Sequence, residues 1–375
     1  MSSPRPENAA DVIVVGGGVI GMMTARELAV AGRRVALLER GHTGSEASWA
    51  GGGIVSPLYP WRYPEAVTAL ATPAQEAYPR LAASLLAETG IDPELFPCGM
   101  LMLDAADAFD ARTWAAAQGR RLEAWGAVRL QQEMPGLATH WTSGLWMPTV
   151  ANIRNPRLLQ ALRASLLALG VVIHEQAEVV AWRQGAGTVS AALTSDGRAF
   201  DAADFVVCGG AWTGKLLQQA GQEVALRPVR GQMLLYRLEP GELSCIVLAE
   251  GRYVIPRRDG HVLCGSTLEE TGFDKSTTAE ALASLAASAA RLWPALQGRE
   301  PVAQWAGLRP AAPNGIPYIG RVPGSGNLWV NAGQFRNGLV LAPASARLLA
   351  DLLLARTPAV DPHPYQILQQ DLTAR

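Results

Sequence analysis

Cysteine, histidine and charged residues are scarce in this sequence, and each scarcity excludes a class of protein. The four cysteines lie far apart and form no C-x-x-C pair, so we expect buried, reduced thiols rather than zinc or iron–sulfur ligands. The five histidines have no metal-ligand spacing, and no G-x-S-x-G segment of the hydrolase type occurs. The sequence therefore predicts neither a metal site nor a serine hydrolase.

Charge of one sign is not in excess either. Lys and Arg number 32 and Asp and Glu 33, so the net charge of −1 gives no bulk attraction to nucleic acid or to an anionic membrane. The longest uncharged stretch, 134–153, contains prolines and hydroxyl residues, unlike a transmembrane helix, and the polar N-terminus does not resemble a signal peptide. We therefore expect a cytoplasmic protein without nucleic-acid or membrane partners.

Apolar residues, in contrast, are abundant enough for more than one core. The chain has 375 residues, of which 49% are hydrophobic. At roughly 150 residues per domain, this length predicts two or three domains and a core large enough to enclose a cofactor.

The N-terminal segment follows the pattern of a strand, a glycine turn, a helix and a second strand. An apolar run at 12–15 precedes G-x-G-x-x-G at 16–21, and the apolar residues that follow recur at helical spacing until Gly32. A second apolar run at 35–38 ends in Glu39, 18 residues after the last glycine of the turn. This pattern indicates a dinucleotide-binding unit, because the turn lets backbone N–H groups approach a pyrophosphate and Glu39 can accept hydrogen bonds from a ribose.

The rest of the chain combines further α/β segments with a region of short antiparallel strands. Two acidic residue–glycine pairs separate three short β-rich runs between 245 and 267, which predicts an antiparallel meander. We expect the residues before Asp11 to be disordered. The other predicted elements are helices at 106–125, 155–169, 279–293 and up to 354, and strands at 171–174, 178–182, 205–207 and 327–333.

Six motifs along the chain carry a resemblance to a known family. They read VIVVGGGVIG at 12–21, SEASWAGGGI at 45–54, VVCGGAWTG at 206–214, RYVIPRRDG at 252–260, WAGLRPAAPNGIPYIG at 305–320 and AGQFRNGLVLAP at 332–343. Through these motifs nearly the whole chain resembles the D-amino-acid oxidase superfamily of FAD enzymes, and most closely the glycine oxidases of thiamine biosynthesis. Together the motifs are far more specific than the first one alone.

The resemblance implies a non-covalent FAD site built from several segments. No cysteine lies where the monomeric sarcosine oxidases attach their flavin covalently. By resemblance, the first glycine turn holds the pyrophosphate, Glu39 the ribose and the Val179 backbone the adenine, while a helix N-terminus stabilises the anionic reduced flavin. The residues expected to bind the cofactor are Gly16, Gly18, Val19, Ile20, Gly21, Glu39, Arg40, Ser48, Ala50, Gly51, Gly52, Val179, Gly209, Gly210, Trp212, Gly333, Phe335, Arg336, Asn337, Gly338 and Leu339.

Arg309 and Tyr253 are the expected catalytic residues. Arg309 lies in an apolar, proline-flanked stretch whose nearest acids in sequence are Glu300 and Asp351. A buried guanidinium needs an anion, so it binds either a substrate carboxylate or a distant acid of the chain. Tyr253 shares a strand face with Ile255, and from the sequence alone a core tyrosine is the alternative. The resemblance makes Arg309 the carboxylate clamp and lets the Tyr253 phenol reach the same carboxylate.

Three further residues are expected to bind the substrate by resemblance, namely Leu248, Leu268 and Arg336. Leu248 replaces an aromatic residue of the family and Leu268 a methionine, and 152–154 replaces an acidic stretch. These departures leave the size and the preference of the substrate pocket open.

The predicted fold is α/β, with a Rossmann-type FAD-binding domain and a second, antiparallel-sheet α+β domain that binds the substrate. The FAD-binding domain is discontinuous and is expected to comprise 1–88, 148–222 and 303–375. The substrate-binding domain is expected to comprise 89–147 and 223–302.

The resemblance implies oxidative deamination of glycine, with sarcosine and small D-amino acids as further substrates. The carboxylate is fixed so that the α-carbon hydrogen faces the flavin and leaves as hydride, without a side-chain base. Hydrolysis of the imine gives glyoxylate and ammonia, and oxygen reoxidises the flavin to give hydrogen peroxide.

Other functions are compatible with the same motifs. A D-amino acid or sarcosine oxidase or dehydrogenase of amine catabolism would share the site, and a nicotinamide dehydrogenase would share the first glycine turn but purify colourless. A non-catalytic FAD-binding assembly protein would be yellow, yet amines would not bleach it. The electron acceptor is oxygen or a membrane quinone, of which the lack of an anchor favours oxygen, and a homo-oligomer is compatible with the sequence.

Overall fold

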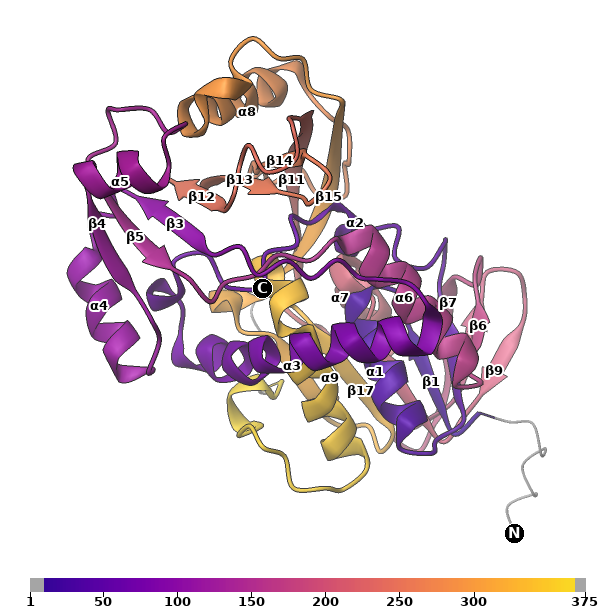
Figure 1. Cartoon of the computed structure of the whole chain (residues 1–375). Helices are drawn as coiled ribbons and strands as arrows, with labels where there is room; N and C mark the ends of the chain where they lie inside the picture. The colour runs from indigo at the N-terminus through magenta and orange to yellow at the C-terminus, as the bar shows by residue number, and fades with distance from the viewer. Residues whose placement is uncertain (1–9, 368–375) are drawn as a thin grey trace.

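Two large β-sheets, accompanied by a small three-stranded one, organise the computed structural model, which describes residues 10–367 (Figure 1). One sheet is mostly parallel and has helices on one face, and the other is mostly antiparallel. The predicted α/β class, with a parallel-sheet part and an antiparallel-sheet part, is confirmed. The prediction of a disordered N-terminal tail falls on residues outside the described range.

The parallel sheet has six strands in the order β16-β17-β10-β1-β2-β6, and only β16 runs antiparallel to its neighbour. Its strands are almost continuously apolar because both faces of the sheet are covered. They are β1 (Val12–Val15), β2 (Val35–Leu38), β6 (Val172–His174), β10 (Asp204–Val207), β16 (Tyr318–Arg321) and β17 (Leu328–Ala332).

Alternate residues of β1 point into different cores. Val12 and Val14 pack against helices on one face of the sheet, whereas Ile13 and Val15 pack against a separate three-stranded sheet and a short helix on the other. The helices of the first face are α1 (Val19–Val30), α3 (Glu65–Thr89), α6 (Asn155–Ala168) and α9 (Gly338–Leu353). The other face carries β7 (Val179–Gly185), β8 (Thr188–Thr194), β9 (Ala199–Asp201) and α7 (Thr213–Gln218).

The second sheet has eight strands in the order β15-β11-β14-β13-β12-β3-β5-β4 and is antiparallel except between β12 and β3. The predicted meander forms three of its central strands. Its strands are β3 (Met100–Leu103), β4 (Glu123–Gly126), β5 (Ser143–Met147), β11 (Arg227–Arg237), β12 (Ile246–Ala249), β13 (Arg252–Pro256), β14 (His261–Gly265) and β15 (Ala303–Ala311).

Helix α8 (Ala279–Leu292) covers the outer face of the antiparallel sheet, as Figure 1 shows at the top of the molecule. The inner face carries an apolar cluster that includes Met233 and Tyr253. The remaining α-helices are α2 (Ala47–Ala50), α4 (Ala108–Ala117) and α5 (Ala127–Glu133). The short 3₁₀ helices are η1 (Pro60–Arg62), η2 (Gly210–Trp212), η3 (Pro294–Leu296), η4 (Pro313–Gly315), η5 (Phe335–Asn337) and η6 (His363–Tyr365).

One predicted element is wrong. The long helix expected at 106–125 is a shorter helix, α4, followed by strand β4. Gly119 adopts a left-handed conformation with φ of 61° just after α4, which ends the helix. Trp125 then stacks on Trp146 of the neighbouring strand at a centroid distance of 5.0 Å, so its burial comes from the sheet rather than from a helix.

The division into two domains stays a prediction. Strand β15, which the predicted boundaries place with the cofactor-binding segments, is hydrogen-bonded along its length to β11 of the antiparallel sheet. Strand β15 therefore belongs to the antiparallel sheet, although its later residues line the cavity between the two large sheets. Across residues 10–367, the structure contains no helix with the length and apolarity that a membrane crossing requires.

Candidate functional site

A cavity lies where the carboxyl end of the parallel sheet meets the inner face of the antiparallel sheet. The empty volume of this cavity is about 1160 Å³, which includes open solvent at its mouth. The carboxyl ends of parallel strands are the usual ligand-binding edge of such sheets. Four segments supply most of the wall, namely 18–20, 47–54, 307–310 and 331–339.

The first glycine turn is shaped by close backbone approach. A Cβ on Gly16, which has φ of 112°, would lie 2.3 Å from Cys208 O, and a Cβ on Gly21 would lie 1.9 Å from Gly16 O. Both positions therefore require glycine. The turn delivers Gly18 and the first residues of α1 to the cavity, so a helix N-terminus with its partial positive charge faces the ligand space.

Glu39 is buried beside this turn but does not line the cavity. Its Oε2 accepts a hydrogen bond from Gly17 N at 2.7 Å, and its Oε1 accepts one from Gly41 N at 2.8 Å. Both oxygens are thus already engaged by the backbone. The ribose contact of Glu39 stays a prediction, and these two bonds fix where the carboxylate lies.

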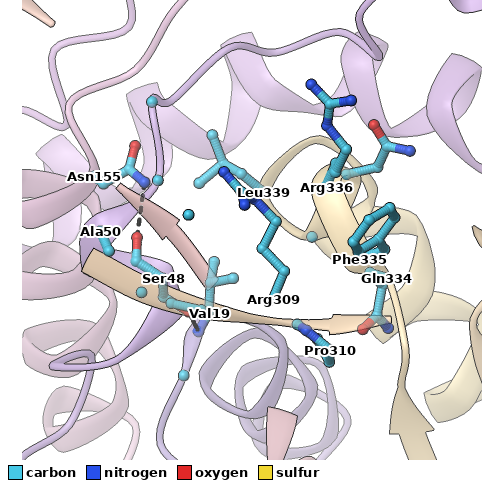
Figure 2. Close-up of a pocket in the computed structure, with 18 of the residues that line it drawn as sticks. Val19, Ser48, Ala50, Asn155, Arg309, Pro310, Gln334, Phe335, Arg336 and Leu339 are labelled. Atoms are coloured by element: carbon cyan, nitrogen blue, oxygen red, sulfur yellow. Dashed lines mark hydrogen bonds between the residues drawn. The ribbon is translucent and has the colours of Figure 1, made fainter. Parts of the chain in front are cut away.

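The loop that contains α2 forms one wall of the cavity, and side chains from other segments hold three of its carbonyl groups. Every second carbonyl from Ser48 to Gly52 accepts one of these bonds, and Figure 2 shows the first of them. The bonds run from Asn155 Nδ2 to Ser48 O at 2.7 Å, from Trp305 Nε1 to Ala50 O at 3.0 Å and from Arg257 Nη2 to Gly52 O at 3.0 Å.

Arg309 extends from β15 into the cavity, as Figure 2 shows. Its Nη1 donates to Thr267 O at 3.1 Å and its Nη2 to Ser266 Oγ at 2.7 Å. The guanidinium lies so close over Gly231 that a Cβ there would be 2.0 Å from Nη1. Among the described residues, no carboxylate lies within 4.0 Å of this guanidinium. Glu269, the acid that faces it from further away, is ion-paired with Arg230.

Electrostatics at Arg309 favours an incoming anion. Burial lowers the pKa of the Arg309 guanidinium below its ordinary value, the nearby Tyr253 phenol opposes this shift, and the charge of Arg336 reinforces it. Arg309 and Arg336 are the only charged side chains among the described residues that line the cavity. The cavity therefore carries positive charge that the chain does not neutralise locally.

Tyr253 lies on the cavity side of β13 and is buried. Its hydroxyl contacts Met233 Sδ at 3.5 Å, and a thioether is a weak acceptor. Glycine at position 265 leaves room for the ring, because a Cβ there would lie 2.8 Å from Tyr253 Cε2. The phenol is thus fixed in place beside the same cavity as Arg309.

The segment before α9 forms the opposite wall. Phe335 adopts a left-handed conformation with φ of 49°, and the chain then enters α9, so a second helix N-terminus faces the cavity. Arg336 comes from this side in Figure 2, and no ion pair involving it occurs within the described range. Positive charge from two helix ends and two guanidinium groups therefore surrounds one space.

The structure leaves some predicted site residues outside the cavity wall. Leu248 is fully buried as the cross-strand partner of Tyr253, and Leu268 is 52% exposed. Arg40 stacks on the Trp212 ring at 3.5 Å instead of facing the cavity. The roles of these residues stay predictions, as do those of the other predicted cofactor residues that lie away from the wall, namely Gly16, Gly21, Glu39, Val179, Gly209, Trp212 and Gly333.

Asn155, Trp305 and Arg257 are site residues that sequence reasoning missed. Asn155 was expected only as the start of a helix, and the other two lie in motifs without an assigned role. Each acts on the loop at 47–53 from a distant part of the chain, so no local pattern indicates the contact. Arg257 carried no usable signal either, because Arg258 and Asp259 follow it directly and make the segment read as an ordinary charged turn.

The residues present fit an FAD group. Two polar atoms of the cavity wall are buried without a hydrogen-bond partner, the acceptor Asn155 Oδ1 and the donor Asn337 Nδ2. A flavin ring offers both donors and acceptors at its edge, and its reduced form is anionic. The two helix N-termini and the glycine turn suit the negative charge of a pyrophosphate and of this ring.

The fold and the cavity thus define a protein of the dinucleotide-binding class. A sequence-family model described as FAD dependent oxidoreductase matches residues 11–352. The chain is 54% identical to a glycine oxidase of Pseudomonas aeruginosa over 94% of its own length and 97% of that protein. It is 32% identical to a bifunctional protein ThiO/ThiG of Synechocystis over 93% of its own length and 52% of that protein.

A solved structure shares the whole arrangement. The crystal structure of glycine oxidase from Geobacillus kaustophilus superposes with a TM-score of 0.91 at 30% identity, covering 96% of this chain and 99% of that one. The chain belongs to the family of FAD-dependent oxidoreductases that includes D-amino-acid oxidase. The predicted family and the predicted dependence on FAD are confirmed.

Proposed function

We propose that this enzyme catalyses the oxidative deamination of glycine to glyoxylate and ammonia, with oxygen as the electron acceptor and hydrogen peroxide as a product. The names of the relatives above support glycine as the substrate. The observation that carries the proposal is the Arg309 guanidinium, which lies in the cavity without a contacting acid of the chain. A small carboxylate is the ligand that such a group binds best, because the contact is bidentate and charge-assisted.

In this proposal Arg309 and Tyr253 bind and orient the substrate carboxylate. Ser266 and Thr267 O hold the guanidinium on one side, and Gly231 leaves room for it, so its direction is set before the substrate arrives. Arg336 adds positive charge on the opposite wall. Orientation of the α-carbon is then the main contribution of the protein to the rate.

The proton of the substrate amine must leave before the chemistry. In the described part of the chain, no Asp, Glu, His or Lys lines the cavity that could accept it. The positive charge of Arg309 and Arg336 favours the neutral amine over the ammonium form, so the substrate loses this proton to solvent. When bound, FAD supplies the two-electron acceptor that removes hydride from the α-carbon.

The residues that line the cavity support a proposal for the cofactor contacts. The N-terminus of α1 with Gly18 would face the pyrophosphate, and the loop at 47–53 would border the isoalloxazine ring. Phe335, Asn337 and the N-terminus of α9 would hold its pyrimidine end. Most of the remaining predicted cofactor residues lie outside the cavity wall, and we propose that these bind the adenosine half of FAD.

A role in thiamine biosynthesis is part of the proposal. The relative from Synechocystis is named as a bifunctional protein, and this chain spans about half of its length. We infer that the oxidised glycine product is used for thiazole synthesis, and that the enzyme acts in the cytoplasm. Sarcosine and small D-amino acids are the second candidate substrates, because the same carboxylate contact would bind them.

Anaerobic reduction of the flavin tests the substrate directly. The purified enzyme is expected to be yellow and to lose its visible absorbance on addition of glycine, because hydride transfer reduces the bound flavin. Sarcosine and D-alanine are expected to bleach it more slowly. The measurement is a stopped-flow absorbance trace for each amine. A protein that glycine leaves oxidised while D-alanine bleaches it would contradict the proposed substrate, and one that no amine bleaches would contradict an amine oxidase.

The pH dependence of kcat/KM is expected to follow the substrate rather than the enzyme. With no carboxylate, imidazole or lysine in the described cavity wall, the activity should rise with pH as the substrate amine loses its proton. Across N-substituted glycines of different basicity, the midpoint of this rise should shift with the pKa of the amine. Steady-state profiles measure it, and a midpoint that stays constant across the series would show that an enzymatic base controls the reaction.

A further inference from the structure

A second buried guanidinium holds the loop that forms one wall of the cavity. Arg257 follows β13, is 6% exposed, and donates to Gly52 O at 3.0 Å, to Ile153 O at 2.9 Å and to Asn152 Oδ1 at 2.5 Å. No ion pair joins it to any acid of residues 10–367. Burial lowers the pKa of Arg257 to about 10, so the group stays charged at neutral pH. All three acceptors of its hydrogen bonds are therefore neutral groups.

The two acids that act on Arg257 are ion-paired with other residues. Glu94 and Asp259 act on it from beyond contact distance, and both are ion-paired with Arg154, at 3.1 Å and 2.9 Å. Arg154 itself is a second positive charge near Arg257. Burying a guanidinium without an ion-pair partner costs folding free energy. We therefore ask whether the charge of Arg257 acts on a group that faces the cavity.

The peptide between Gly52 and Gly53 connects Arg257 to the cavity. In a planar trans peptide, the carbonyl oxygen and the N–H of the next residue point in opposite directions. Because Gly52 O is bonded to Arg257, the N–H of Gly53 points away from Arg257, and both glycines line the cavity. Within the described part of the chain, this N–H has no hydrogen-bond acceptor.

The peptides that contain Ser48 O and Ala50 O have neither a charged donor on the oxygen nor an unused N–H. Their donors, Asn155 and Trp305, are neutral. The N–H groups on the far side of those peptides are already used inside the loop, since Trp49 N donates to Glu46 O at 3.0 Å and Gly51 N to Ala47 O at 3.2 Å. The Gly52–Gly53 peptide is thus the one that combines a charged donor on its oxygen with an unused N–H. A charge-assisted bond to the oxygen polarises the peptide and strengthens the N–H as a donor.

We propose that Arg257 is a positioning residue for the flavin ring: it aims and polarises the Gly53 N–H toward the ring and thereby stabilises the reduced flavin over the oxidised one. The reduced ring carries more negative charge, so a fixed donor and the guanidinium behind it favour that state. This inference rests on the proposed placement of the ring beside 47–53 and does not depend on glycine being the substrate.

The midpoint potential of the bound flavin tests this inference in the holoenzyme, without any amine substrate. Arg257→Gln removes the charge, and the potential is expected to fall by about 30 mV, which corresponds to a tenfold shift in the two-electron reduction equilibrium. Arg257→Lys keeps the charge and is expected to restore most of the potential. The matched control is Arg258→Gln at the adjacent arginine, which contacts Asp92 and Leu95 O and should leave the potential unchanged.

A second variant keeps Arg257 and every bond that it donates. Asn152→Asp places a carboxylate at the atom that lies 2.5 Å from Arg257 Nη1, which cancels the charge while strengthening the tie between the segments. The proposal predicts a lower potential in this variant too. A role confined to holding the loop predicts an unchanged potential in Asn152→Asp, and that result would overturn the proposal even if Arg257→Gln does not retain FAD. Failure of glycine to bleach the wild-type flavin would leave these potentials interpretable, so the two proposals fail separately.

Discussion

Arg309→Ala is expected to lower kcat/KM for glycine by about 30- to 900-fold, the equivalent of about 2 to 4 kcal/mol of lost binding to the substrate carboxylate. The guanidinium lies in the cavity without a contacting acid, so its charge is available to the substrate. The loss should fall mainly on KM, because the carboxylate contact is present in both the ground state and the transition state. Steady-state kinetics at matched FAD content measure it.

A companion variant tests whether the orientation of the Arg309 guanidinium, and not only its presence, contributes to substrate binding. Gly231→Ala keeps Arg309 but places a Cβ 2.0 Å from Nη1, which displaces the end of this flexible side chain. A smaller loss of the same kind is expected, again mainly in KM. Wild-type KM in Arg309→Ala at full FAD occupancy would show that the carboxylate binds elsewhere.

Gly21→Ala is expected to abolish stable FAD binding and to destabilise the fold. The new Cβ would lie 1.9 Å from Gly16 O, a backbone atom that cannot move without disturbing the glycine turn. Overpacking of this kind costs about 1 to 3 kcal/mol or more, and here the cost falls on the turn that approaches the pyrophosphate. The ratio of flavin to protein absorbance after gel filtration, together with the thermal unfolding midpoint, measures both effects.

The matched control for this variant is Gly126→Ala at the end of β4. A Cβ there would meet no atom within 4 Å, and the residue has φ of −88°, which alanine adopts readily. This control should stay yellow with an unchanged unfolding midpoint. A Gly21→Ala protein that retains FAD and unfolds at the wild-type temperature would contradict the close approach described for the turn.

The parts of the fold that the sequence predicts well are those set by local patterns. The strand, glycine turn, helix and strand from Val12 to Leu38 follow directly from apolar runs separated by glycine, and so does the meander of the antiparallel sheet. The prediction of a helix at 106–125 failed because alanine-rich local composition favours a helix, whereas Trp125 is placed by strand pairing with Gly144, 19 residues away.

In the candidate site, too, the residues with a local sequence signal were predicted and those placed by long-range contacts were not. Arg309 was predicted because a guanidinium in an apolar stretch without nearby acids needs an external anion, and the structure shows no contacting acid within the described residues. The three donors that hold the loop at 47–53 were not predicted, because their sequence separations from the loop are 107, 255 and 205 residues. Contacts of that range depend on the assembled fold rather than on any pattern in the sequence.

The central claim is that Arg309 binds the carboxylate of a small substrate beside the flavin. The most direct measurement is a crystal structure of the FAD-loaded enzyme with glycolate, an unreactive analogue in which a hydroxyl replaces the amine of glycine. We predict that the glycolate carboxylate lies within hydrogen-bond distance of both Arg309 Nη atoms, with the Tyr253 hydroxyl on the same carboxylate. Glycolate bound away from Arg309, or Arg309 paired with Glu269 in that complex, would contradict the claim.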